Sequence, residues 1–221
     1  MRAAHGCEFN ESTRWRPTDV PAWPFWENAL MADAGTLHTM FLDELRDSYD
    51  AERQLTKALP KLADAASTPD LKRAFEMHLD ETRGQIARLE QVFEGLGERP
   101  SGKHCDGIAG IIEEGKAIMD EDLDAATMDA CLIAAGQRAE HYEMAAYGTL
   151  VAWARSMGHD DAAELLQQNL DEESAADEKL TEIAESGINQ AAAERAHPNG
   201  EMRGAKGKMT SASKTQMPRQ H

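Results

Sequence analysis

The chain has 221 residues, a length that suits one domain with a substantial core and terminal extensions. Hydrophobic residues make up 41% and aromatic residues only 5%, a composition that favours helices over β-sheets. The formal net charge of −17 argues against a nucleic-acid-binding surface on the folded part, because phosphate binding needs a basic face.

Residues 1–35 are predicted to form an irregular N-terminal arm, because they hold three prolines and show no helical periodicity. The arm also contains Trp15, Trp23 and Trp26. Three interpretations fit these residues: the arm packs its aromatic side chains on the rest of the protein, it is disordered, or translation begins at Met31.

Two long helices are predicted next, over residues 37–66 and 69–96. In both, apolar residues recur with alternating steps of three and four, which places them on one face. Between the helices, Thr68 suits the N-cap and Pro69 the first helical position. Gly97 is expected to end the second helix.

The following segment predicts one short helix over residues 108–120 and two long helices over 124–157 and 161–186, the last two joined by a turn at Gly158. A short helix suits the crossover between the second and third long helices of a bundle. The predicted fold is therefore an all-α, antiparallel four-helix bundle over residues 36–190, with a short extra helix in the crossover.

Residues 191–221 are predicted to be a disordered basic tail of Gly, Lys, Ser and Met without periodicity. From Ala193 onwards, six Lys and Arg stand against two Glu. Because these charges are few and scattered, a solubilising role is favoured over nucleic-acid binding.

Membrane insertion and disulfide bonding are both disfavoured. No apolar run approaches the roughly 20 residues that a membrane-spanning helix needs. The three cysteines, Cys7, Cys105 and Cys131, form no CxxC pair, which favours a reducing, cytoplasmic compartment. Cys105 is predicted to be a loop thiol and Cys131 to be buried.

Acidic residues interrupt the predicted inward face of every long helix. Burying ionised carboxylates without a partner costs several kcal/mol each, and a shared pair of metal ions removes that cost. Oxygen and imidazole ligands suit iron or manganese. The residues assigned to this metal site are Glu52, His78, Glu81, Glu140, Glu143, Glu173 and Asp177.

Sequence spacing supports the same hypothesis. His78 and Glu81 are three residues apart, as are Glu140 and Glu143, so each pair shares one helix face. A weak internal repeat, in which an Ala-Glu pair recurs at Glu52 and Glu140, predicts two similar helical hairpins with carboxylates at matching height.

A purely structural interpretation stands beside the metal hypothesis. In a chain with 40 acidic residues, a single glutamate on an inward face is readily explained as a boundary position. One glutamate on each of four helices favours the metal site. His78 suits a ligand and a core histidine equally well. Tyr147 could be a radical or hydrogen-bond partner to the site, but core packing is the favoured role.

Four stretches together resemble the YciE/YciF stress-protein family, a branch of the ferritin-like superfamily. They are FLDELRDSYDAERQLTKALPKLA, LKRAFEMHLDETRGQIARLEQVF, CLIAAGQRAEHYEMAAYGTL and LLQQNLDEESAADEKLTEIA, and the resemblance covers residues 36–187. It implies a ferritin-like four-helix bundle that is often dimeric, a link to stress responses, and a centre of two iron or manganese ions.

The sequence departs from the usual superfamily pattern of Glu-x-x-His on two helices. Here the second helix reads His78-x-x-Glu81, and Ala176 stands where a histidine would follow Glu173. Glu140-x-x-Glu143 resembles the additional glutamate of rubrerythrins. These differences imply a site richer in carboxylates, or a degenerate one.

The resulting hypothesis is a cytoplasmic, homodimeric, ferritin-like stress-response protein whose carboxylate-bridged pair of Fe or Mn ions acts on dioxygen or peroxide. The alternative is a non-catalytic metal-binding or purely structural stress-response bundle. No membrane partner is expected, and no nucleic acid is expected for the bundle. The sequence does not decide whether the protein is an enzyme.

Overall fold

The structure is a computed structural model that describes residues 35–196. Nearly all of the predicted arm and most of the predicted tail lie outside these described residues. The chain divides into two units, residues 1–40 and 41–221. Of the first unit, the structure describes a turn and the first residues of a helix, where Thr39 N donates to Thr36 Oγ1 over 3.3 Å.

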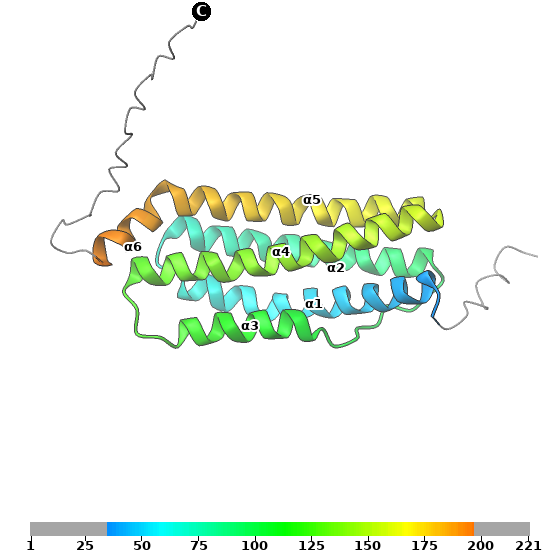
Figure 1. Ribbon diagram of the computed structural model, residues 1–221, viewed down its shortest axis with the longest axis horizontal. Coiled ribbons are helices and arrows are strands. Elements are labelled where there is room, and N and C mark those ends of the chain that lie inside the picture. Colours follow the sequence, from blue (N-terminus) through cyan, green and yellow to red (C-terminus); the bar gives the residue numbers. More distant parts are fainter. Residues whose placement is uncertain (1–34, 197–221) are drawn as a thin grey trace, which may run out of the picture. The chain divides into compact units, whose positions relative to one another are not determined.

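All secondary structure in the described part of the chain is helical. The four long helices are α1 (Leu37–Ala65), α2 (Pro69–Gly95), α4 (Ala125–Met157) and α5 (Asp160–Ile183), and the short helix α3 (Asp106–Met119) lies between α2 and α4 in sequence. From Phe41 onwards, the long helices lie side by side and α3 runs along them (Figure 1). None of the described helices is long and apolar enough to cross a membrane.

The turn between α1 and α2 is fixed by a carboxylate from α4. The buried Asp129 accepts hydrogen bonds from the backbone N–H groups of Ser67, at 2.7 Å, and Thr68, at 2.8 Å, and also from the Thr68 hydroxyl. Thr68 is the N-cap residue of α2, as predicted, but its side chain makes no capping hydrogen bond. Its hydroxyl instead donates to Asp129, which ties the turn to the start of α4.

The turn between α4 and α5 consists of two residues, Gly158 and His159. Gly158 has a φ of +76° and closes α4 through hydrogen bonds from its backbone N–H to carbonyls of the last turn. This left-handed conformation favours glycine and lets α5 run back antiparallel to α4.

The crossover helix α3 is anchored at Cys105. The Cys105 N–H donates to Asp50 Oδ2 over 3.0 Å, and the Gln54 side chain donates to the Cys105 carbonyl over 3.1 Å. The Cys105 thiol accepts from Ile108 N and lies 3.1 Å from the Tyr142 hydroxyl. The predicted loop thiol is thus the buried N-cap of α3, whereas Cys131 is only half-buried.

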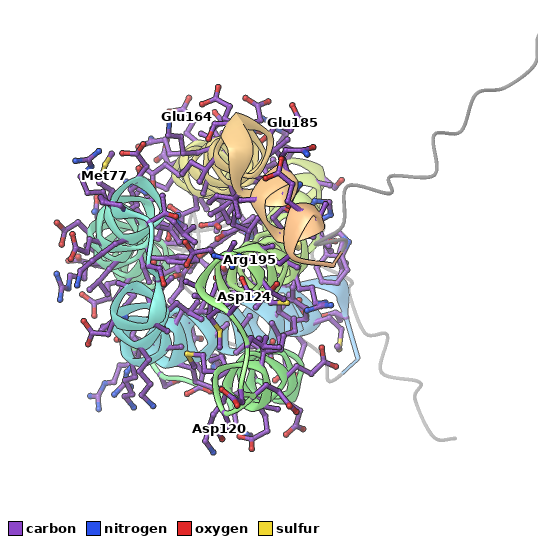
Figure 2. All side chains as sticks on the ribbon, turned by 90° about the vertical axis from the view of Figure 1, so that its left-hand side faces the viewer. Met77, Asp120, Asp124, Glu164, Glu185 and Arg195 are labelled. Atoms are coloured by element: carbon purple, nitrogen blue, oxygen red, sulfur yellow. The ribbon has the colours of Figure 1, made fainter. Side chains whose placement is uncertain are left out.

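The last long helix, α5, ends at Ile183, three residues before its predicted end at Ser186, but the chain stays helical beyond that point. A π-helical turn, η2 (Ala184–Ile188), leads into α6 (Asn189–Ala196), and Gly187 has a φ of +141° in the kink. Both elements pack on α4. Figure 2 shows this end of the bundle, where Arg195 of α6 acts electrostatically on Asp124, the N-cap of α4.

The core has two apolar clusters, one at each end of the long helices. One cluster includes Leu59, Phe75 and Leu132, and the other includes Phe41, Phe93 and Leu150. On each long helix, buried polar residues occupy the positions between the two clusters. These residues are Glu52, His78, Thr82, Gln85, Glu140, Glu143, Asn169 and Glu173.

Candidate metal centre

Four buried side chains converge in the polar section between the two apolar clusters. His78 of α2, Glu140 and Glu143 of α4 and Glu173 of α5 each offer one donor atom, and these atoms all lie within 4.8 Å of one another. Glu140 and Glu143 are one helical turn apart, which explains why α4 presents both to the same point.

The His78 ring lies between a carboxylate on its outer side and two carboxylates in the core. Its Nδ1 lies 3.2 Å from Glu81 Oε2, on the outer side, where the Glu81 side chain is 42% exposed. Its Nε2 lies 3.1 Å from Glu140 Oε2 and 3.7 Å from Glu173 Oε2. A proton on Nδ1 directed at Glu81 leaves Nε2 available as a metal ligand, the usual arrangement for a ligating histidine.

Glu52 of α1 lies beside this group and is 1% exposed. Its Oε1 accepts a hydrogen bond from the Tyr147 hydroxyl, while its Oε2 has no hydrogen-bond partner. Burial raises the pKa of Glu52 to about 7, although Tyr147 and His78 oppose the rise. Burial and the Glu52 carboxylate raise the pKa of Tyr147 well above its usual value, so its hydroxyl stays protonated and donates.

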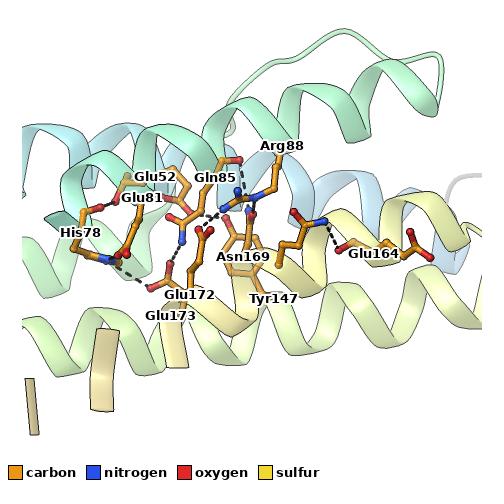
Figure 3. A network of polar contacts seen from close by, with 12 residues as sticks. Glu52, His78, Glu81, Gln85, Arg88, Tyr147, Glu164, Asn169, Glu172 and Glu173 are labelled. Atoms are coloured by element: carbon orange, nitrogen blue, oxygen red, sulfur yellow. Dashed lines mark hydrogen bonds and ion pairs between the residues drawn. The ribbon is translucent and has the colours of Figure 1, made fainter. Parts of the chain in front are cut away.

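Glu173 is positioned by a second row of polar residues, drawn in Figure 3. The Gln85 amide donates to Glu173 Oε1, and the buried Asn169 amide lies 3.5 Å from the Gln85 carbonyl oxygen. Arg88 donates to Asn169 and forms an ion pair with Glu172. Arg88 thereby places one permanent positive charge near the carboxylates.

The carboxylates cannot all be ionised without further positive charge. Burial and the neighbouring carboxylates raise the pKa values of Glu143 and Glu173 well above their usual range. Burial acts on Glu140 in the same direction, but His78 reverses the effect and holds the pKa of Glu140 below its usual value. Burial alone would lower the pKa of His78, yet Glu140 raises it well above the usual value.

The donor set fits metal ions. Both oxygens of Glu143, Oε2 of Glu52 and Oε2 of Glu173 are buried without a hydrogen-bond partner. Such unpaired carboxylate oxygens are costly unless a cation shares them. Carboxylate oxygens with one imidazole nitrogen suit iron and manganese better than soft metals, which prefer sulfur.

A groove of about 700 Å³ between α2 and α5 leads from the surface to His78, Glu81 and Glu140. On its α5 wall, Ala175 and Ala176 stand beside the larger Lys179, Leu180, Glu182 and Ile183. Ala176 follows Glu173 by three residues, so a larger side chain there would project towards the metal cluster. The groove therefore gives small solutes access to two of the candidate ligands.

The structure brings some of the seven predicted site residues together and leaves others apart. His78, Glu140, Glu143 and Glu173 form the cluster, Glu52 borders it, and Glu81 lies at the rim. Asp177 does not join them. Its carboxylate accepts from Gln137 over 3.1 Å and pairs with the exposed His141 over 3.3 Å, because it turns sideways towards α4.

Sequence reasoning missed the residues that position the ligands. Gln85 and Tyr147 lie on inward helix faces. Gln85 is not among the predicted site residues, and for Tyr147 the sequence favours packing over the hydrogen bond to the site that the structure shows. A polar amide on an otherwise apolar stripe was the available signal for Gln85, since it lies two turns beyond His78 on the same helix. Asn169 and Arg88 gave no comparable signal.

One known protein family matches most of this chain. Residues 36–193 match the model of the family described as a domain of unknown function, DUF892. The chain belongs to the DUF892 family. It is 43% identical to Protein YciF of Escherichia coli K12 over 162 residues, which cover 73% of this chain and 98% of that protein.

Solved structures of relatives carry the same fold. The crystal structure of the E. coli stress protein YciF matches with a TM-score of 0.68 at 43% identity, over 71% of this chain and 99% of that one. YcfI from Rhodopseudomonas palustris matches with a TM-score of 0.66 at 47% identity, over 68% of this chain and 96% of that one. The helical part of this DUF892 chain thus corresponds to nearly the whole of each relative.

Proposed function

We propose that this protein is a ferritin-like four-helix bundle that binds two divalent iron or manganese ions in the polar section of its core. The charge balance supports two ions. Glu52, Glu140, Glu143 and Glu173 carry four negative charges when ionised, and two divalent cations neutralise them while His78 stays neutral. These four glutamates and His78 would hold the two ions.

The observation that carries the proposal is the set of unpartnered oxygens on Glu52, Glu143 and Glu173, buried beside the His78 ring. A structural core would pair these oxygens with amides or hydroxyls, as it does for Asp129, which accepts three hydrogen bonds. A binding site keeps its ligand atoms free of protein donors.

A pair of such ions would supply electrons to dioxygen or peroxide, the reaction that we assign to the site. The protein's own groups hold the reacting region in place. The Tyr147 hydroxyl orients Glu52, and the Gln85 amide orients Glu173. The groove between α2 and α5 reaches His78 and Glu140, and this access for small polar solutes supports turnover over passive metal storage.

The biological setting is inferred from the relatives. The E. coli protein YciF is described as a stress protein, and we extend a stress-response role to this chain. Homodimerisation and a cytoplasmic location belong to the same proposal. Light scattering tests the first, since a monomer at tens of micromolar protein contradicts it.

Metal analysis of the purified and reconstituted protein tests the site. About two iron or manganese ions per chain are expected, and both Glu52→Ala and Glu140→Ala should lose them. Asp177→Ala is the matched control, because its carboxylate lies outside the cluster, and it should keep the metal. Absence of metal from the reconstituted wild type contradicts the proposal and favours a purely structural bundle.

If metal binds but no oxidation of bound Fe²⁺ by dioxygen or peroxide is measured, the non-catalytic metal-binding alternative is correct. One preparation of the protein therefore distinguishes catalysis from metal binding without turnover.

A further inference from the structure

Two openings reach the same two candidate ligands from different helices. His78 and Glu140 line both the groove between α2 and α5 and a smaller pocket between α1, α3 and α4. Glu140 is 1% exposed, and its Oε2 lies 3.1 Å from His78 Nε2 without receiving a hydrogen bond. An ion that arrives through either opening therefore meets a buried carboxylate oxygen that is free to bind it.

The pocket between α1, α3 and α4 presents positive charge to an arriving ion. Lys61 of α1 and Lys116 of α3 are exposed and contribute to its lining. Glu113 pairs with Lys116 over 3.4 Å, which leaves the ammonium group of Lys61 as the net charge at this opening. Cations are repelled by such a charge, so this opening is unfavourable for divalent metal ions.

The groove between α2 and α5 has the opposite charge. Arg73 pairs with Asp70, and Lys179 pairs with Glu182, each within one turn of its own helix, so these four charges cancel. Apart from the two candidate ligands, the remaining charged residue of the described lining is Glu81. A carboxylate in a cleft raises the local concentration of cations, which favours this opening for metal ions.

Glu81 links the solvent to the metal cluster. Its side chain is 42% exposed, whereas the side chains of Glu140 and Glu173 are 2% and 0% exposed. Its Oε2 lies 3.2 Å from His78 Nδ1, at the edge of the cluster. Removing the whole hydration shell of an ion in one step is costly. A half-exposed carboxylate can replace part of that shell before the buried ligands replace the rest.

We propose that divalent iron and manganese ions enter through the groove between α2 and α5, and that Glu81 is the entry carboxylate. Glu81 binds each ion transiently and passes it to Glu140 and Glu173. The inference rests on the proposed function, to which it adds the route of the metal ions. This role differs from that of a permanent ligand, which the sequence predicts for Glu81.

Stopped-flow measurement of Mn²⁺ uptake and release by the full-length protein tests this role, with a fluorescent chelator as the reporter. A group that binds an ion only during its passage changes both rate constants by the same factor and leaves Kd unchanged. Glu81→Gln should therefore slow uptake and release together, by about tenfold. Glutamine keeps an oxygen that can accept a hydrogen bond from His78 Nδ1, so the histidine keeps its orientation.

Glu76→Gln is the matched control. It removes the same charge from the same helix, and Glu76 is exposed and lies outside the groove lining. It should change neither rate constant. Equal slowing by Glu76→Gln and Glu81→Gln would assign the effect to overall charge and overturn the proposal. A weaker Kd in Glu81→Gln at an unchanged uptake rate would also overturn it, because Glu81 would then act on the bound ion.

Two charge reversals test the choice of opening. Lys179→Glu adds negative charge to the groove, and Lys61→Glu makes the same change at the pocket between α1, α3 and α4. Lys179→Glu should accelerate Mn²⁺ uptake, and Lys61→Glu should leave it unchanged. Faster uptake in Lys61→Glu than in Lys179→Glu would place the entry at the pocket and overturn the proposal.

Equilibrium binding of Mn²⁺ separates this inference from the proposed function. A wild type that binds no Mn²⁺ refutes the metal centre, and the entry route with it. A wild type that binds Mn²⁺, together with a Glu81→Gln variant that takes up and releases the ion at wild-type rates, refutes only the entry role of Glu81.

Discussion

Gln85 illustrates how one side chain outside the ligand group shapes the site. Its amide nitrogen donates to Glu173 Oε1, and its own Oε1 is buried without a partner. A fully buried glutamine with one unsatisfied oxygen is a cost to stability. Its contact with a candidate ligand therefore indicates a positioning role, in which Glu173 is held with Oε2 towards the cluster.

Replacing Gln85 with Leu should weaken Mn²⁺ binding by about 10–100-fold, the usual effect of removing a hydrogen bond to a metal ligand. Calorimetric titration of metal-free protein measures the change. Gln137→Leu is the matched control, since Gln137 donates to Asp177 outside the cluster. Equal effects of the two substitutions would contradict a positioning role for Gln85.

Glu143 provides a second test at the scale of one residue. Both of its oxygens are buried and unpartnered, and burial raises its pKa well above the usual range. Without metal, Glu143→Leu should raise the free energy of unfolding by about 1–4 kcal/mol, because apolar packing replaces an uncompensated polar group. Urea denaturation of the metal-free proteins measures this change in the free energy of unfolding.

The same Glu143→Leu variant should lose metal. Glu178→Leu, on the exposed face of α5, serves as control and should change stability by less than about 0.5 kcal/mol. A metal-free Glu143→Leu protein less stable than the wild type would show that Glu143 has a structural role.

At the scale of elements, the sequence was a reliable guide to where helices begin and end. Periodicity placed all five predicted helices within three residues of the observed bounds, since their apolar faces and terminal Gly and Pro residues are local features. Long-range contacts were not predictable. The Asp129 carboxylate that binds Thr68, and the anchoring of Cys105 on α1, join residues about 50 to 60 positions apart.

Gly107, in the first turn of α3, permits the close approach of Tyr142. A Cβ added there would lie 2.6 Å from the Tyr142 ring. Gly107→Ala should therefore lower the free energy of unfolding by about 1–3 kcal/mol through overpacking. At Gly110, on the same helix, an added Cβ meets nothing within 4 Å.

Gly110→Ala should consequently stabilise the protein by up to about 1 kcal/mol, the ordinary difference in helix propensity. Urea denaturation of Gly107→Ala and Gly110→Ala separates the effect of the contact with Tyr142 from the effect of helix propensity. Equal shifts in both variants would mean that Tyr142 moves aside without cost and that α3 is not fixed by this contact.

In the whole molecule, a polar section divides the core into two apolar clusters, and this arrangement was only partly readable from sequence. One inward glutamate per helix predicted Glu52, Glu140 and Glu173, because helical periodicity determines the buried face. Periodicity could not decide between His78 and Glu81, which are one turn apart. It also placed Asp177 inward, although that side chain turns towards His141.

The polar section lies in the middle of the bundle, so removing metal from it should lower the free energy of unfolding. The size of this decrease should depend on pH. Burial raises the pKa of Glu52 from 4.5 to about 7, and those of Glu143 and Glu173 rise in the same direction. Raised carboxyl pKa values stabilise the folded state below the unfolded pKa. For Glu52, this contribution disappears as the pH rises from 4.5 through about 7.

Bound Mn²⁺ replaces those protons, so its stabilisation should grow with pH over the same range. Free metal at a hundredfold excess over Kd should add about 2.7 kcal/mol to the free energy of unfolding. Thermal denaturation with Mn²⁺ or EDTA, at matched pH values below and above 7, measures the difference. Glu140→Ala should abolish it, whereas Asp177→Ala should retain it. Equal stabilisation of wild type and Glu140→Ala would place the metal elsewhere on this acidic chain.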